Sequence, residues 1–125
     1  MGANQSVVEF TSSFTSVTVS RGQAGNLIAQ INVEGSSAAY GPFVGTVTVT
    51  GANKGGSWHY EAFAMPADGS RVTGTADGSY ESLGPTSWRT IGSGKIESDT
   101  AIQNLRLDAV FDFGKHSWNG TLTPI

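Results

Sequence analysis

The sequence predicts an all-β protein whose strands close into an antiparallel up-and-down barrel of about eight strands. Seventeen glycines punctuate the 125 residues, and glycine marks tight turns and sharp bends in strands. Between the glycines apolar and polar residues alternate, as at Leu27, Ala29 and Ile31, which is typical of half-buried strands. No segment holds an apolar period of 3.6 residues over three turns. We therefore expect a single barrel domain over residues 1–125, with residues 1–5 disordered.

Each expected strand is bounded by turn residues, and Pro66-Ala67-Asp68-Gly69 is a strong hairpin signal. The first strand is long and is expected to contain a bulge, and a turn is expected at Gly35-Ser36-Ser37. Every connection is short enough for a hairpin, which favours a closed barrel over a two-sheet sandwich. The expected strands span residues 7–20, 27–34, 40–50, 57–65, 71–81, 87–96, 102–113 and 116–123.

Composition excludes several classes of function. The chain has no cysteine, which rules out disulfides, thiolate nucleophiles and cysteine-ligated zinc, and fits a reducing compartment. A net charge of −3 gives no basic footprint for nucleic acid or anionic membranes, and no apolar run is long enough to span a bilayer. The N-terminus does not resemble a signal peptide, so a cytoplasmic location is expected. Because only 14% of residues are charged, we expect a homo-oligomer, most simply a dimer.

Aromatic and glycine-containing motifs toward the C-terminus carry a family resemblance. They are Tyr80-Glu81, Gly84-Pro85, Trp88-Arg89, Gly92-Ser93-Gly94 and Ser117-Trp118-Asn119-Gly120-Thr121-Leu122. Over about the last two thirds of its length the chain resembles small bacterial barrels related to the allene oxide cyclase and dirigent group, which are lipocalin-like in outline. The resemblance implies a β-barrel and, among other functions, cofactor-free cyclase or isomerase activity. It carries over no catalytic residue.

The densest chemical stretch is Trp58-His59-Tyr60-Glu61. In a regular strand His59 and Glu61 share one face with Phe63, while Trp58 and Tyr60 share the other. If the first face lines the barrel, an acid/base pair stands in an apolar pocket. If the second does, the aromatic rings fill the core and His59 and Glu61 are solvated. Both phases are compatible with the sequence.

The sixth and seventh expected strands leave similar alternatives. Trp88 and Arg89 lie on opposite faces, and a buried Arg89 would need a carboxylate or an anionic ligand as partner. In the seventh strand, the favoured arrangement turns the apolar face, with Phe111, to the core. Arg106 would then form a surface ion pair with an aspartate, whereas the reverse arrangement gives a polar pocket and an apolar subunit interface.

Other candidates carry weaker signals. His116 lies at a turn, where it is either a guard of the barrel mouth or a solvated residue, and Tyr40 and Tyr80 are expected in the barrel wall with their hydroxyls at the rim. No nucleophile elbow, phosphate loop, dinucleotide fingerprint or metal-ligand spacing is present, so we expect no cofactor and no metal.

The expected function is cofactor-independent isomerisation, cyclisation or elimination of a small hydrophobic molecule held in the barrel. The candidate catalytic residues are His59, Glu61, Tyr60 and Arg89. The candidate ligand-binding residues are Trp58, Phe63, Tyr80, Trp88, Phe111 and Trp118. Two alternatives stay open: a carrier that binds an apolar ligand without turnover, and an interaction protein with a filled interior. A titratable group inside the cavity would favour the enzyme, and a purely apolar cavity would favour the carrier.

Overall fold

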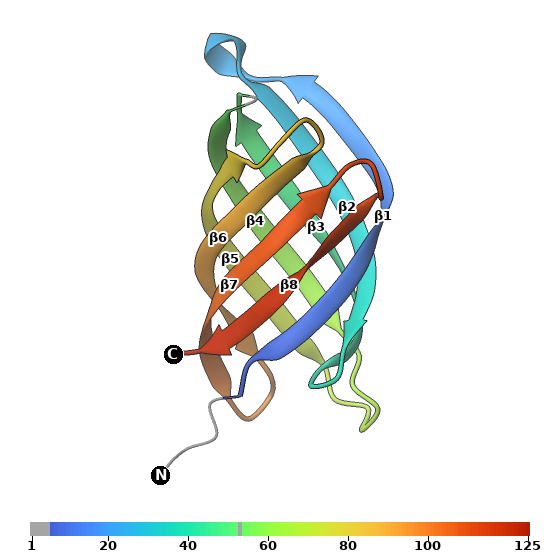
Figure 1. Ribbon diagram of the computed structural model, residues 1–125. Helices are drawn as coiled ribbons and strands as arrows, with labels where there is room; N and C mark the ends of the chain where they lie inside the picture. The colour runs from blue at the N-terminus through green and yellow to red at the C-terminus, as the bar shows by residue number, and fades with distance from the viewer. Residues whose placement is uncertain (1–5, 53) are drawn as a thin grey trace.

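The computed structural model describes residues 6–52 and 54–125, and Figure 1 shows them as one closed barrel. Eight antiparallel strands follow one another around the barrel in chain order, and the last pairs with the first. The strands are β1 (Val8–Arg21), β2 (Leu27–Ser37), β3 (Gly41–Gly51), β4 (Gly55–Ala64), β5 (Val72–Ser82), β6 (Ser87–Glu97), β7 (Ile102–Asp112) and β8 (Ser117–Pro124). The predicted fold class is confirmed. Among the described residues, no helix is long and apolar enough to cross a membrane.

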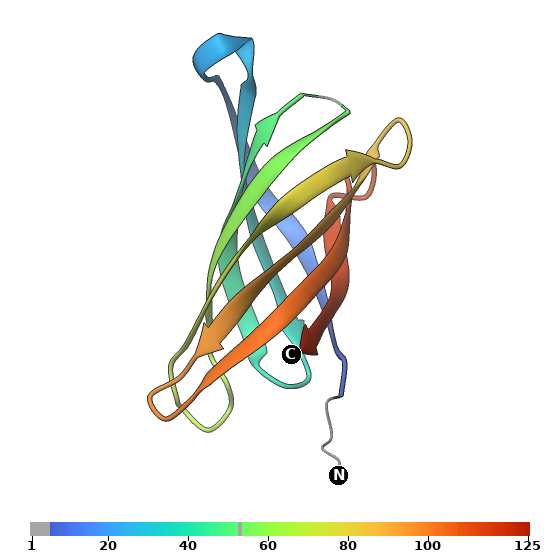
Figure 2. The ribbon, with the colours of Figure 1, turned by 90° about the vertical axis from the view of Figure 1, so that its left-hand side faces the viewer.

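The barrel has two distinct ends, seen in Figures 1 and 2. The start of β1 and the end of β8 lie at the lower end, with the turns that join β2 to β3, β4 to β5 and β6 to β7. The upper end carries the other four turns, and the β1–β2 hairpin projects beyond them. A short 3-10 turn, η1 (Gln23–Gly25), closes this hairpin.

The predicted bulge in the first strand is present between Phe14 and Ser16 of β1. Before the bulge even-numbered residues face the interior, as Phe10 and Ser12 do, both of which are buried. After it the phase changes, so that Val17 pairs with Ile31 of β2 and lies on the inner face. The extra residue therefore keeps apolar side chains inside along both halves of a long strand.

The turn predicted at Gly35-Ser36-Ser37 is wrong, because β2 continues through these residues to Ser37. Gly35 pairs with Ser12, and a Cβ atom there would overlap the carbonyl oxygen of Thr11. The glycine thus permits a close approach of two backbones instead of starting a turn. The turn comes later, where Ser37 Oγ accepts a hydrogen bond from the Tyr40 amide and Gly41 has a φ of 74°.

Small residues on the inner faces of β5 and β6 make room for large aromatic rings. Gly78 and Gly92 are directly paired, and a Cβ atom on either would overlap a carbonyl oxygen of the other strand. Ala76 pairs with Gly94 beside them. This stretch of wall therefore brings almost no side-chain volume to the interior, which Trp58 and Trp118 occupy instead.

Candidate functional site: two hollows separated by an aromatic plug

The middle of the barrel is filled by an aromatic plug made of Phe10, Trp58, Tyr60, Phe111 and Trp118. Trp118 is fully buried, and its ring stacks on that of Phe111 with centroids 5.0 Å apart. The other three rings meet Trp118 edge-on, with centroid distances between 4.8 and 6.3 Å. The plug divides the interior into separate upper and lower hollows.

The polar atoms of the plug are satisfied inside the barrel. Trp118 Nε1 donates a hydrogen bond of 3.0 Å to Thr90 Oγ1, which donates in turn to the Ala109 carbonyl oxygen at 2.9 Å. Trp58 Nε1 donates to the Ser79 carbonyl oxygen at 2.9 Å. Thr90 is fully buried, so this chain of bonds orients the Trp118 ring where water does not reach it.

Above the plug lies an open hollow of about 260 Å³, which we call the upper cup. Its floor is formed by Ile31, Thr90 and Phe111, which are almost inaccessible to solvent. Its wall and mouth consist mainly of apolar side chains. These are Val19, Leu27, Ala29, Val49, Ala52, Tyr80, Trp88 and Phe113, with Gly51 between them.

The polar side chains of the upper cup are already engaged. Tyr80 Oη donates a hydrogen bond of 2.7 Å to the Ala52 carbonyl oxygen at the mouth, and burial raises the pKa of the Tyr80 phenol. Thr90 holds Trp118 in the floor. Among the described residues, no Asp, Glu, His, Lys or Arg lines the cup. It is therefore an apolar receptacle without an acid/base pair.

Below the plug lies a second hollow of about 70 Å³, lined by Tyr40, Phe43, Tyr60, Val72 and Leu107 among others. Burial raises the pKa values of Tyr40 and Tyr60 further above neutral pH, so neither phenol ionises there. A closed apolar cavity of about 150 Å³ takes up benzene. The lower hollow is smaller than this, which makes it a poorer place for an organic ligand than the upper cup.

The structure places His59 and Glu61 on the outer face of β4 and Trp58 and Tyr60 on its inner face. The phase in which His59 and Glu61 line the interior is therefore wrong. The inner face of β4 is the one that carries small residues besides the two rings, and its neighbours on β5 are glycine and alanine. Large rings opposite small residues fill a barrel at normal packing density, whereas a charged pair there would be desolvated.

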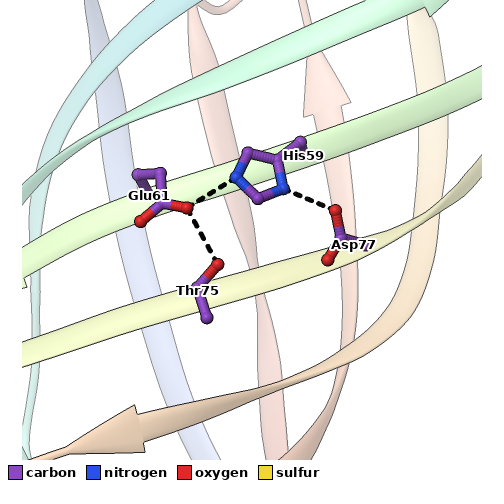
Figure 3. Close-up of polar contacts among 4 residues, drawn as sticks. All are labelled: His59, Glu61, Thr75 and Asp77. Carbon is purple, nitrogen blue, oxygen red and sulfur yellow. Dashed lines mark hydrogen bonds and ion pairs between the residues drawn. The ribbon is translucent and has the colours of Figure 1, made fainter.

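On the outer wall, His59 stands between two carboxylates, as Figure 3 shows. Its Nδ1 lies 2.5 Å from Asp77 Oδ1 and its Nε2 lies 2.6 Å from Glu61 Oε2. Thr75 Oγ1 donates a further hydrogen bond of 3.0 Å to Glu61 Oε2. The bonds to Asp77 and Glu61 raise the pKa of His59, which favours the imidazolium that donates to both. Among the described residues, no group of His, Asp and Glu side chains is arranged to hold a metal ion.

Asp77 and Thr75 were not among the residues predicted from the sequence. They lie directly opposite His59 and Glu61 in the β4–β5 ladder. The hairpin signal at Pro66–Gly69 predicts that β4 and β5 are neighbours, and the alternation of β5 predicts which of its residues share a face. The pairing of His59 with Asp77 also requires the register of the hairpin, which these two signals do not give. Choosing candidate residues within single strands therefore missed Asp77 and Thr75.

Arg89 also lies on the outer wall, so the lumenal alternative for this residue is wrong. Its Nε and a terminal nitrogen reach the two oxygens of Asp108 at 3.1 and 2.7 Å, and both side chains are about two-fifths exposed. This ion pair lowers the pKa of Asp108. The sequence suggested an ion pair between Arg106 and an aspartate of the same strand, either Asp108 or Asp112, whereas the observed partner of Asp108 is Arg89 of the neighbouring strand. The inward apolar face of β7 is as predicted.

The predicted ligand-binding residues separate into three groups. Trp88, Tyr80 and Phe111 line the upper cup. Trp58 and Trp118 belong to the plug and face no open space. Phe63 lies on the outer face of β4 with 38% of its surface exposed, which corrects its placement in an inner wall.

His116 lies in the turn between β7 and β8, exposed and with a φ of 54°. Its ring centroid is 6.0 Å from that of Phe14, and its carbonyl oxygen accepts a hydrogen bond from the Phe14 amide. Residues of the cup that the sequence argument missed include Ala29, Val49 and Phe113. The alternation of each strand predicts that these side chains point inward. It does not predict that they lie at the level of the upper cup.

No protein-family model matches the chain, and neither a curated protein nor a solved structure matches it. The resemblance to the allene oxide cyclase and dirigent group therefore stays a prediction, and the functional argument depends on the geometry of the barrel.

Proposed function

We propose that this protein binds a small apolar molecule in the upper cup. The observation that carries the proposal is a hollow of about 260 Å³ with apolar walls, aromatic rings contributed by β5, β6 and β7, and a buried floor. An apolar cavity of about 150 Å³ is enough for benzene, so the upper cup has room for a ligand of one or two fused rings or a short hydrocarbon chain.

The lining favours binding over turnover. The Tyr80 and Thr90 hydroxyls of the described lining both already donate within the protein. The raised pKa of Tyr80 makes its phenol a poor base at neutral pH. His59 and Glu61 lie on the other side of the barrel wall and cannot reach a ligand in the cup. Cofactor-independent isomerisation, cyclisation or elimination remains a prediction, because the described lining of the cup offers no general base for such a reaction.

The test is a calorimetric titration with naphthalene and indole as probes, repeated on a variant whose cup is filled. Ala29 lies on the inner face of β2 within the cup, whereas Gln30 is the next residue and points outward. We expect Ala29→Trp to weaken binding by about tenfold or more, equivalent to ~1.4 kcal/mol. Gln30→Trp adds the same side chain outside the wall and should bind like the wild type. Equal binding by Ala29→Trp and the wild type, or no binding by the wild type, would overturn the proposal.

A further inference from the structure

The barrel has an unpaired strand edge at its upper end. The β1–β8 ladder runs from Val8, paired with Leu122, to Ser13, paired with Ser117, where β8 begins. One more hydrogen bond on this side joins the Phe14 amide to the His116 carbonyl oxygen. From Ser16 to Arg21, among the described residues, β1 pairs with β2 alone. Figures 1 and 2 show this part of the hairpin standing clear of the rest of the barrel.

Exposed edge strands in natural proteins normally carry features that prevent pairing, such as lysine, proline or inward-pointing charges. The segment Ser16-Val17-Thr18-Val19-Ser20 has none of these. Its three central residues, Val17, Thr18 and Val19, have high strand propensity, and the two valines are 40% and 62% exposed. The first charged residue is Arg21, at the end of the strand. This edge is therefore open to another strand.

The segment is also a palindrome. When two copies lie antiparallel with Thr18 opposite Thr18, Ser16 faces Ser20 and Val17 faces Val19 on both sides of the twofold axis. Each residue then meets a chemically matched partner, and all ladder positions of the segment are filled. A self-complementary edge of this kind indicates a second copy of the same chain as the occupant.

The topology predicts that such pairing stops at two copies. In the described residues, every other pair of neighbouring strands stays paired up to the upper end of the barrel, so this end offers a single free edge. Once two such edges pair about a twofold axis, neither is left for a third chain. This distinguishes a closed dimer from open-ended strand addition.

We propose that the protein forms a twofold dimer through antiparallel pairing of residues 16–20 of β1 with the same residues of a second copy. Because Val17 and Val19 follow the inward phase of β1, the second copy's strand extends the apolar inner face of the hairpin. Val19 borders the upper cup, so the dimer contact adjoins the cup without filling it. The proposal does not depend on ligand binding.

The first test is sedimentation velocity of the wild type and of two lysine variants. Thr18→Lys places two like charges across the twofold axis, and we expect it to convert the dimer to a monomer, most completely at low salt. Thr11→Lys makes the same change on the outer face of the same strand, where β8 covers the edge, and should remain dimeric. A monomeric wild type, or a Thr18→Lys variant that stays dimeric, would overturn the proposal.

A second test uses the absence of cysteine from the chain. Residues directly opposite each other in an antiparallel pair have Cβ atoms about 4.5 to 5.5 Å apart. Thr18→Cys should therefore be cross-linked to a covalent dimer by a short bis-maleimide, whereas Thr11→Cys should not. Equal cross-linking of both variants, or of neither, would contradict the proposed register even if the lysine variant changed the sedimentation.

Discussion

The middle and the upper end of this barrel use the same strands but solve the packing problem in opposite ways. In the middle, glycine and alanine on β5 and β6 face large rings, and the space is filled by the plug around Trp118. At the upper end, Ala29 and Val49 are paired on the adjacent strands β2 and β3, and the side chains of the wall leave a hollow. The difference teaches that barrel closure alone does not create a binding site. The site arises where side-chain volume falls short of the space that the strands enclose.

The comparison predicts that the plug carries far more of the folding stability than the cup. Trp118→Ala should lower the free energy of unfolding by about 3 to 5 kcal/mol, since it empties a buried site that the neighbouring rings only partly refill. Urea unfolding followed by circular dichroism measures this loss. Trp88→Ala, at the half-buried wall of the cup, should lose clearly less. Equal losses of unfolding free energy in the two variants would mean that the plug and the cup contribute equally to stability.

The hydrogen bond inside the plug can be tested without changing its volume. Thr90→Val removes the acceptor of Trp118 Nε1 and leaves a buried donor unpaired, which should cost about 1 to 3 kcal/mol of stability. Thr90→Ser keeps the hydroxyl and should retain most of the stability. The same urea titration serves, and a Thr90→Val variant as stable as the wild type would show that Trp118 finds another partner.

At the mouth of the cup, a substitution should affect ligand binding more than it affects folding stability. Phe113 is partly exposed and packs edge-on against Phe14 and Trp88, with centroids 5.0 and 5.3 Å away. Phe113→Ala should therefore lower stability by only about 1 to 2 kcal/mol. It should weaken naphthalene binding as well, because it removes part of the wall. Unchanged affinity in the calorimetric titration would place the ligand elsewhere.

The smallest expected effect comes from the outer wall. Because the pKa of His59 is raised above its ordinary value of 6.5, its ion pairs stabilise the fold fully below that value. The contribution is then lost as pH rises through the higher folded-state pKa. The difference in melting temperature between the wild type and His59→Gln should thus be largest near about pH 5.5 and shrink at alkaline pH.

Since His59, Glu61 and Asp77 are about half or more exposed, the difference should be small and should decrease with added salt. Asp77→Asn removes one of the two carboxylate partners of His59. The difference in melting temperature between the wild type and this variant should follow the same pH trend with a smaller amplitude. A difference that grew toward alkaline pH would contradict the assigned protonation state.

Much of this architecture follows from the sequence by itself. The alternation of apolar and polar residues, the glycine and proline turns and the short connections determined the eight strands, their order and the closure of the barrel. These features are local, because side-chain alternation has a period of two and hairpin turns specify antiparallel neighbours. The inward face of β7 was readable for the same reason, since one of its faces is uniformly apolar.

The tertiary structure decided the rest. Both faces of β4 carry aromatic or apolar side chains, so its inward face depended on the small residues that β5 and β6 present across the interior. The pairing of His59 with Asp77 and of Arg89 with Asp108 depended on the register between strands. Where the interior is filled and where it stays open depends on the summed volume of side chains from all strands at one level. No single segment contains that sum, so only the assembled barrel shows the cup above its plug.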